Sequence, residues 1–344
     1  MNKKSTILKT GILFCLFLAL LIFCSCDEKE ILEPGGPQLP PLTDPIPYEA
    51  LISGTIVFER IGPYPGEYSG WYVIDVGKRK NWSLGFKVPV ALQAVSPDGE
   101  KILFSANSIY VMNIFGSDVQ KLTENEFGGF ASWAPDGSKI YFRQKYPERL
   151  YSQSPVPRAN DLQLIHQFTV SIGGQEYYNY PSGAVTVSPN GKIAYVCNVN
   201  RQHGLAGLYI MDSDGSNLEL ILALPEDRNF DSPVFSKDGQ KIYFLSVEKD
   251  AAYAYKGIDV VKVKTDGSHF ETILSLAASG SKEWADGKLN SVYLALSPDD
   301  SKFLLNLPEG DFVSHLYVLN NDGSNLTQVT FAEGVTDRCV SWGN

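Results

Sequence analysis

Apolar residues recur along the chain in short runs, each preceded by the same polar turn. The runs read KILF, KIYF, KIAY, KIYF and KFLL, and each follows a tetrapeptide close to S-P-D-G. Short runs rich in Ile, Phe and Tyr, bounded by Pro, Asp and Gly, are typical of β-strands between tight turns. The turns lie at Ser96–Gly99, Ala134–Gly137, Ser188–Gly191, Ser236–Gly239 and Ser297–Asp300, and the predicted strands at 101–105, 139–143, 192–197, 241–246 and 302–306.

A second strand follows in four of these repeats and ends in a glycine-containing hairpin. The second strands read IYVMN, LYIMD, DVVKV and LYVLN, and the hairpins read FGSD, SDGSN, TDGSH and NDGSN. Glycine supplies the positive φ that a tight hairpin needs. A third strand follows each hairpin. Together with the strand before the next S-P-D-G turn, each unit predicts a four-stranded antiparallel blade.

The repeat resembles the PD40-type repeat of TolB-like β-propellers, and the likeness covers nearly everything from 51 to 344. It is weaker around 151–167, where the hairpin glycine is missing. The TolB family also has an N-terminal α/β domain, which a proline-rich segment replaces here. The resemblance therefore implies the propeller fold, and no role in the Tol complex is carried over.

The spacing of the repeats predicts an all-β protein with one six-bladed propeller at 50–344. A repeat of about 49 residues fits six times into this stretch. The strands GTIVFER and GWYVIDV lie upstream of the first turn motif, and the C-terminal CVSW matches a first strand with nothing after it. We expect the C-terminal strand to pair with 54–60 in the N-terminal blade and close the ring.

The N-terminus predicts export from the cytoplasm. Residues 1–25 have a short basic start and an apolar run, as a signal peptide does. The run ends in F-C-S-C, which resembles the lipobox of bacterial lipoproteins and implies lipidation of Cys26; simple cleavage and secretion is the alternative. The acidic D-E-K-E that follows resembles the surface-export signal of lipoproteins from Bacteroidota-like bacteria. A solvated linker would also be acidic, so this alternative stays open. Residues 26–49 then form a proline-rich stalk, and the expected location is the outer membrane, exposed at the cell surface.

The charge of the chain limits its partners. Its 29 basic and 39 acidic side chains give a net charge of −10, and removal of the signal peptide takes away three more lysines. Nucleic-acid and anionic-lipid binding are disfavoured. We expect a monomer that meets the membrane only through its lipid anchor. Cys197 and Cys339 fall in separate predicted blades, which argues against a disulfide between them.

The two tight turns of each repeat keep their length, whereas the other connections vary. In an up-and-down blade the varying connections share one face, which we call the loop face; the repeated turns form the turn face. Binding sites of repeat proteins usually lie on the variable side. The candidate ligand-binding residues are Tyr146, Arg149, Tyr178, Arg228, Trp284, His315, Asp337 and Arg338.

Metal and cofactor sites are not expected. The turn aspartates occur once per repeat and are suited to capping their own turns, and the four histidines fall in separate blades. No zinc spacing, nucleophile elbow, phosphate loop or dinucleotide glycine pattern occurs in the sequence.

Two functions remain open. The favoured one is a non-catalytic module that binds a glycan or an envelope protein through the loop face, with no catalytic residue. The alternative is a polysaccharide lyase or glycoside hydrolase in the central channel. Its acids and bases would be Asp231, His315, Asp337 and Arg338.

Overall fold

The computed structural model describes residues 39, 41–62, 70–86, 90–124, 129–144, 148–249, 255–277, 292–310 and 313–344. Within them regular structure is almost entirely β, and helix is confined to the short segments α3 (Tyr48–Leu51) and η2 (Arg201–His203). No helix in these ranges is both long and apolar enough to cross a membrane.

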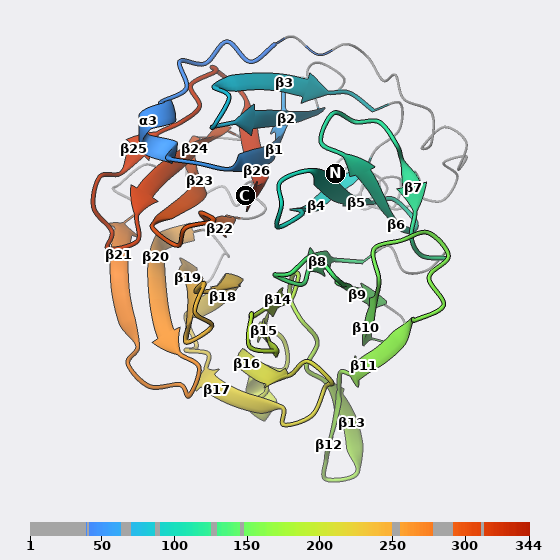
Figure 1. The fold of residues 1–344 in the computed structure, drawn as a ribbon. Helices are drawn as coiled ribbons and strands as arrows, with labels where there is room; N and C mark the ends of the chain where they lie inside the picture. The colour runs from blue at the N-terminus through green and yellow to red at the C-terminus, as the bar shows by residue number, and fades with distance from the viewer. Residues whose placement is uncertain are drawn as a thin grey trace, which may run out of the picture.

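The sheets stand around a central axis in a propeller arrangement (Figure 1), so the predicted all-β propeller is confirmed. Four of the sheets are four-stranded and antiparallel. Their strands are β4 (Ala91–Val95), β5 (Lys101–Ser105), β6 (Ile109–Asn113) and β7 (Gln120–Lys121); β8 (Ala131–Trp133), β9 (Ile140–Gln144), β10 (Arg149–Gln153) and β11 (Gln163–Gln167); β14 (Thr186–Val187), β15 (Lys192–Cys197), β16 (Gly207–Asp212) and β17 (Glu219–Ala223); β18 (Arg228–Phe235), β19 (Lys241–Lys249), β20 (Tyr255–Lys264) and β21 (Glu271–Ala277).

The remaining large sheet has eight strands and combines the two ends of the domain. In it β26 pairs antiparallel with β1, from Thr55 opposite Gly343 to Ile61 opposite Thr336, which is the pairing expected of the C-terminal strand. The strands are β22 (Leu294–Leu296), β23 (Lys302–Gly310), β24 (Val313–Asn320), β25 (Thr327–Gln328), β26 (Thr336–Gly343), β1 (Thr55–Ile61), β2 (Gly70–Asp75) and β3 (Lys80–Leu84).

The sheet count differs from the prediction of six blades. Taken as separate sheets, the described residues form four four-stranded blades, the eight-stranded sheet and one two-stranded sheet. The physical reason is one parallel bridge, Ser314 opposite Thr336, which joins β24 to β26 and merges strands that the repeat spacing assigns to two units.

Neighbouring sheets pack through apolar side chains, in the order in which they follow one another. The strands that precede the repeated turns, together with the C-terminal strand β26, contact one another in the order β26, β4, β8, β14, β18 and β22, and β22 also contacts β26. One apolar cluster joins β1 and β2 to β23 and β24, with Phe58 and Leu304 fully buried in it. Cys197 is a free thiol buried in another cluster, as the sequence indicated, and burial raises its pKa to about 11.

The S-P-D-G turns are held together by the serine hydroxyl. Ser297 Oγ donates to Asp299 Oδ1 (2.6 Å) and accepts the backbone N–H of Lys302 (2.9 Å), and the turns at Ser96 and Ser236 repeat both bonds. Burial alone would raise the pKa of Asp299, but its hydrogen bonds hold the pKa below the ordinary value. The turn aspartates are therefore occupied by their own turns.

The hairpin glycines are required by their neighbours as well as by φ. A Cβ on Gly267, whose φ is +78°, would lie 2.4 Å from the carbonyl oxygen of Ile221 in the preceding sheet. Each hairpin therefore sits directly on the outer strand of the sheet before it. The equivalent pairs are Gly215 with Ile165, Gly323 with Ile273 and, against a side chain, Gly116 with Leu84.

Three of the variable connections expected on the loop face, 171–183, 247–257 and 308–315, consist largely of strands. Segment 171–183 contains most of a separate hairpin, β12 (Thr169–Ile172) and β13 (Gln175–Tyr178), which projects from the ring in Figure 1. Segment 247–257 is largely the extension of β19 and β20, and 308–315 that of β23 and β24, because these two hairpins continue pairing beyond the core.

Candidate functional site

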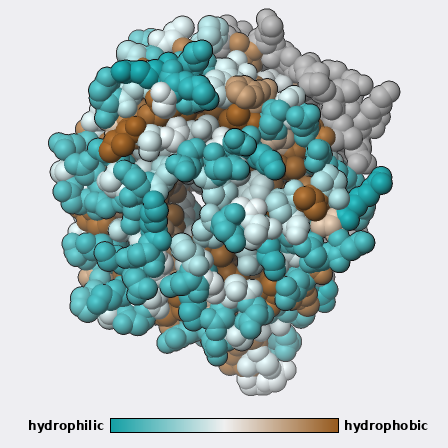
Figure 2. Space-filling view, viewed as in Figure 1, coloured by the Kyte–Doolittle hydropathy of each residue, from teal (hydrophilic) through white to brown (hydrophobic). Residues whose placement is uncertain are grey.

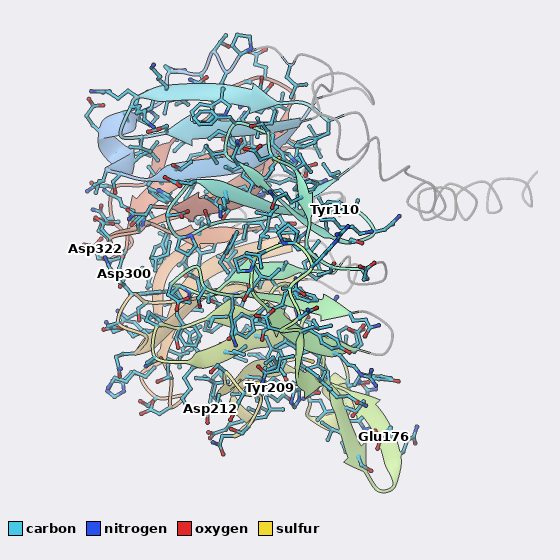
Figure 3. The ribbon with its side chains drawn as sticks, turned by 45° about the vertical axis from the view of Figure 1, so that its right-hand side comes forward. Tyr110, Glu176, Tyr209, Asp212, Asp300 and Asp322 are labelled. Carbon is cyan, nitrogen blue, oxygen red and sulfur yellow. The ribbon has the colours of Figure 1, made fainter. Side chains whose placement is uncertain are left out.

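The two faces of the ring differ in their polar groups. Figure 3 shows Asp300 and Asp322, from two repeated turns, on one side of the molecule, and Glu176, from the β12–β13 hairpin, on the other. Among the described residues no group of three or more His, Cys, Asp and Glu could hold a metal ion. Four of the candidate residues of the loop face fall into two groups: His315 and Asp337 in a buried network, and Tyr178 and Arg228 in an exposed platform.

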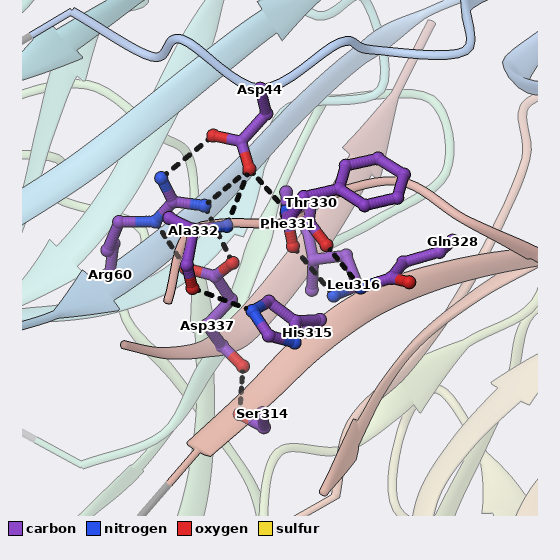
Figure 4. A network of polar contacts seen from close by, with 10 residues as sticks. All are labelled: Asp44, Arg60, Ser314, His315, Leu316, Gln328, Thr330, Phe331, Ala332 and Asp337. Carbon is purple, nitrogen blue, oxygen red and sulfur yellow. Dashed lines mark hydrogen bonds and ion pairs between the residues drawn. The ribbon is translucent and has the colours of Figure 1, made fainter. Parts of the chain in front are cut away.

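The buried network joins three charged side chains from distant parts of the sequence (Figure 4). Arg60, at the end of β1, donates from Nε and Nη2 to the two carboxylate oxygens of Asp337 (2.7 and 2.8 Å). Its Nη1 donates to Asp44 (2.9 Å), in the segment before α3. The side chains of Arg60, Asp337 and Asp44 are 7%, 0% and 1% exposed, so this ion cluster is closed to solvent.

The hydrogen bonds and charges of the network shift the pKa values of Arg60 and Asp44. Burial alone would lower the pKa of Arg60, but the hydrogen bonds and charges of Asp337 and Asp44 raise it. Burial likewise would raise the pKa of Asp44, yet the bonds from Arg60 and from the backbone N–H of Phe331 lower it. Because every member has a charged partner, the network ties the N-terminal segment to β1 and β26.

His315 is locked beside this network. Its Nε2 lies 2.8 Å from the carbonyl oxygen of Ala332 and donates to it, while Nδ1 is 3.0 Å from a carboxylate oxygen of Glu309. The neighbouring Ser314 Oγ donates to the backbone oxygen of Asp337 (2.7 Å). His315 is 5% exposed and Asp337 is fully buried. This arrangement suits a structural role, because neither His315 nor Asp337 can reach a substrate without breaking its present hydrogen bonds.

Arg338 follows Asp337 on β26 and makes a separate ion pair. Its Nε donates to Glu59 Oε2 (2.8 Å), and the two side chains are 34% and 17% exposed. Arg338 opposes Glu59 in the β1–β26 register, so both come from paired strands.

The exposed platform lies around the β12–β13 hairpin. Tyr178, at the end of β13, is 46% exposed, and its carbonyl oxygen accepts a hydrogen bond from Asn200 Nδ2 (2.6 Å). The ring of Tyr177 contacts that of His203, with centroids 4.0 Å apart. The turn that holds η2 therefore braces the base of the hairpin.

Arg228 lies on the other side of the same turn. Arg201 donates to the carbonyl oxygens of Pro225 (2.8 Å) and Arg228 (2.5 Å), which connects the η2 turn to the start of β18. The Arg228 guanidinium pairs with Asp259 and lies 3.5 Å from Glu248. Arg228 and Asp259 line a groove of about 370 Å³ with exposed Phe270.

The structure brings some of the predicted residues together and separates others. His315 and Asp337 share the buried network, and Tyr178 and Arg228 flank the η2 turn. Arg149, at the start of β10, belongs to neither group. Cys26, Tyr146 and Trp284 lie outside the described residues. Asp44 and Arg60 were missed, because their partners are far away in sequence and no motif marks them.

The structure has a central hollow of about 790 Å³, where the alternative function expects a channel, but the residues that line it were not predicted. It is lined by residues from all five repeated turns, among them Pro97, Pro135, Pro189 and Pro298, and by Trp133 and Trp342. Figure 2 shows the molecule hollowed at the centre of the ring. The indole N–H of Trp133, which is 8% exposed, has no hydrogen-bond partner among the described residues. The prolines of the turn motif were the available signal, because they recur at the same place in the ring.

No protein-family model matches the chain, and no curated protein matches it. Solved structures do. TolB from Acinetobacter baumannii superposes with a TM-score of 0.62 at 15% identity, over 84% of this chain and 66% of that one. A protein from Agrobacterium tumefaciens, provisionally assigned as TolB, gives 0.53 at 16% identity, over 85% and 99%. An oligogalacturonate lyase in complex with manganese gives 0.51 at 13% identity, over 77% and 73%. At these identities the likeness is one of fold: the chain is a TolB-like β-propeller.

Proposed function

We propose that this protein is a non-catalytic binding module of the cell envelope, which takes a glycan or an envelope protein on its loop face. One observation carries the proposal: the charged and aromatic groups of that face divide into a closed network and an open platform. Tyr178 and Arg228 are accessible on either side of the η2 turn. Tyrosine and arginine are the residues that most often anchor a bound partner.

Affinity for envelope material tests this function. The mature protein is immobilised and exposed to solubilised envelope fractions, and the wild type is compared with the double variant Tyr178→Ala, Arg228→Ala. We expect the double variant to lose most of the retained material while keeping its thermal midpoint. The matched control is Asp322→Ser on the turn face, which should retain as much as the wild type. Equal retention by all three proteins would reject the loop face.

The same proposal includes six blades around a closed ring. The eight-stranded sheet then counts as two blades joined by the single bridge at Ser314. The cyclic order of contacts between the first strands and the apolar cluster across β1 and β23 support this count.

We further propose that Cys26 anchors the module as a surface-exposed outer-membrane lipoprotein. The support is the lipobox-like end of the signal sequence and the proline-rich segment behind it. Metabolic labelling with a radioactive fatty acid should label the wild type and leave Cys26→Ser unlabelled. Label in both proteins would contradict the assignment.

A second function, catalysis in the central hollow, is favoured by two observations: the hollow is ligand-sized, and an oligogalacturonate lyase has a similar fold. Incubation of the purified protein with oligogalacturonate and manganese tests it through the absorbance of the unsaturated product. We expect no turnover, because Asp337 and His315 are engaged in the buried network. Turnover that Asp231→Asn abolishes would replace the binding function with a lyase.

A further inference from the structure

One of the inter-blade junctions on the turn face departs from the others in chemistry. Each hairpin glycine contacts one residue of the outer strand of the preceding sheet. The residue before the glycine and the residue two positions before that strand residue are therefore an equivalent pair at each junction. Three junctions carry an exposed polar residue with an exposed aspartate. The fourth carries Trp82 and Phe115 instead. The polar pairs are Gln163 with Asp214, Glu219 with Asp266, and Glu271 with Asp322.

The fold does not require a phenyl ring at position 115. In the sister hairpins the aspartate side chain accepts the N–H of the serine two residues later, as Asp322 does from Ser324 (2.9 Å). At this hairpin Asn113 Oδ1 accepts the N–H groups of Phe115 and Ser117 instead (both 3.0 Å). The turn is therefore capped without an aspartate, and Phe115 is 65% exposed, the most exposed of the large apolar residues described.

Trp82 and Phe115 together form a rigid aromatic surface. Their ring centroids are 5.1 Å apart at an interplanar angle of 25°, so the rings are stacked. Trp82 Nε1 donates to the carbonyl oxygen of Ile114 (3.0 Å), and its ring packs on the buried cluster between β2 and β5. Because the indole is fixed on both sides, Phe115 is held in a defined orientation.

Polar acceptors surround this surface. The two rings line a hollow of about 560 Å³, together with Asp75, Asp98 and Glu100. One carboxylate oxygen of Asp98 accepts hydrogen bonds from the Ser96 hydroxyl and from the N–H of Glu100. A carboxylate oxygen of Asp75 accepts one from Lys78 Nζ (2.8 Å). Carboxylates have further lone pairs to accept hydroxyl hydrogens. A volume of this size is typical of small-ligand sites.

We infer that Trp82 and Phe115 form a saccharide-binding site on the turn face, separate from the loop face. The C–H side of a neutral pyranose ring packs on the electron-rich face of an aromatic ring, and its hydroxyl groups donate to carboxylates at the rim. The lining of the hollow carries three carboxylates, Asp75, Asp98 and Glu100, and one basic side chain among the described residues, Lys78. This excess of negative charge repels a uronate or a sulfated sugar. The site therefore selects neutral sugars.

A glycan array tests the site on the intact mature protein. The array carries neutral, uronate-bearing and amine-bearing oligosaccharides, and the variant is Phe115→Asp, which restores the residue of the three sister hairpins. We expect the wild type to retain neutral glycans and Phe115→Asp to bind them about tenfold more weakly. The thermal midpoint should stay unchanged, because the sister turns carry aspartate without strain.

Two controls separate this site from other surfaces. Phe331→Ala removes a phenyl ring that is 42% exposed elsewhere and should bind like the wild type. The loop-face variant Tyr178→Ala should also retain the neutral glycans, so failure of the proposed function would leave this result intact. The inference is overturned if the wild type retains no neutral glycan, if it retains only amine-bearing glycans, or if Phe115→Asp binds equally well.

Discussion

Two arginine–carboxylate clusters on the loop face share the same chemistry and differ in access. The Arg60 and Asp337 side chains are 7% and 0% exposed, whereas those of Arg228 and Asp259 are 24% and 18% exposed. The first cluster spans the two ends of the domain, and the second lines a groove. Residue type alone therefore does not identify a binding site in this propeller: the partners of each side chain decide whether it supports the fold or meets a ligand.

Replacing Arg60 gives the largest effect. Arg60→Met leaves Asp337 and Asp44 buried without their partner, and we expect a loss of about 3–5 kcal/mol in the free energy of unfolding. Arg228→Met should cost less than about 1 kcal/mol, because its partners are accessible to water. Urea unfolding of both variants measures the difference. Similar losses would mean that the two clusters have the same role.

The same contrast of closed and open sites applies to the repeated glycines. Gly267→Ala places a Cβ against the Ile221 carbonyl at a positive φ, and we expect a loss of about 3 kcal/mol. Gly137 has φ +70° and no atom within 4 Å of an added Cβ. Gly137→Ala should therefore cost about 1 kcal/mol, the conformational part alone. Thermal unfolding of both variants checks this, and equal losses would show that the inter-blade contact contributes nothing.

Acid gives the smallest effect and acts on the closed cluster. The pKa of Asp44 is lowered from 3.8 in the folded chain, so its ionised form contributes stability above that value. This contribution is lost as the pH falls through the lowered pKa. Stability of the wild type should decrease more steeply than that of Asp44→Asn when the pH is taken below about 4. Parallel curves of stability against pH would show that ionised Asp44 does not stabilise the fold.

The strand pattern could largely be predicted from the sequence, because the same pattern recurs in each repeat. The predicted strands 101–105 and 192–197 coincide with β5 and β15. The long hairpins β19–β20 and β23–β24 were underestimated, since their outer parts carry charged residues that look like loop. The β12–β13 hairpin was missed although its Gly173-Gly174 turn, flanked by Val, Ile and Tyr, is a recognisable hairpin signal.

The candidate site was harder to predict. His315, Asp337 and Arg338 were chosen for their chemistry and position, and the structure gives each a protein partner. For two of the three the partner lies far away in sequence: Arg60 and Asp337 are 277 positions apart, and Glu59 and Arg338 are 279 apart. Repeat spacing places residues on a face, but it does not say which side chains are covered by another segment, as Asp44 covers this cluster.

Site-specific photo-crosslinking in cells tests the loop-face binding function most directly. A photoreactive amino acid is placed at position 178 on the hairpin or, in a second protein, at position 214 on the turn face, each in the otherwise intact chain. The account predicts a discrete adduct with an envelope component from position 178 and none from position 214. Adducts from position 214 alone, or from neither position, would contradict it.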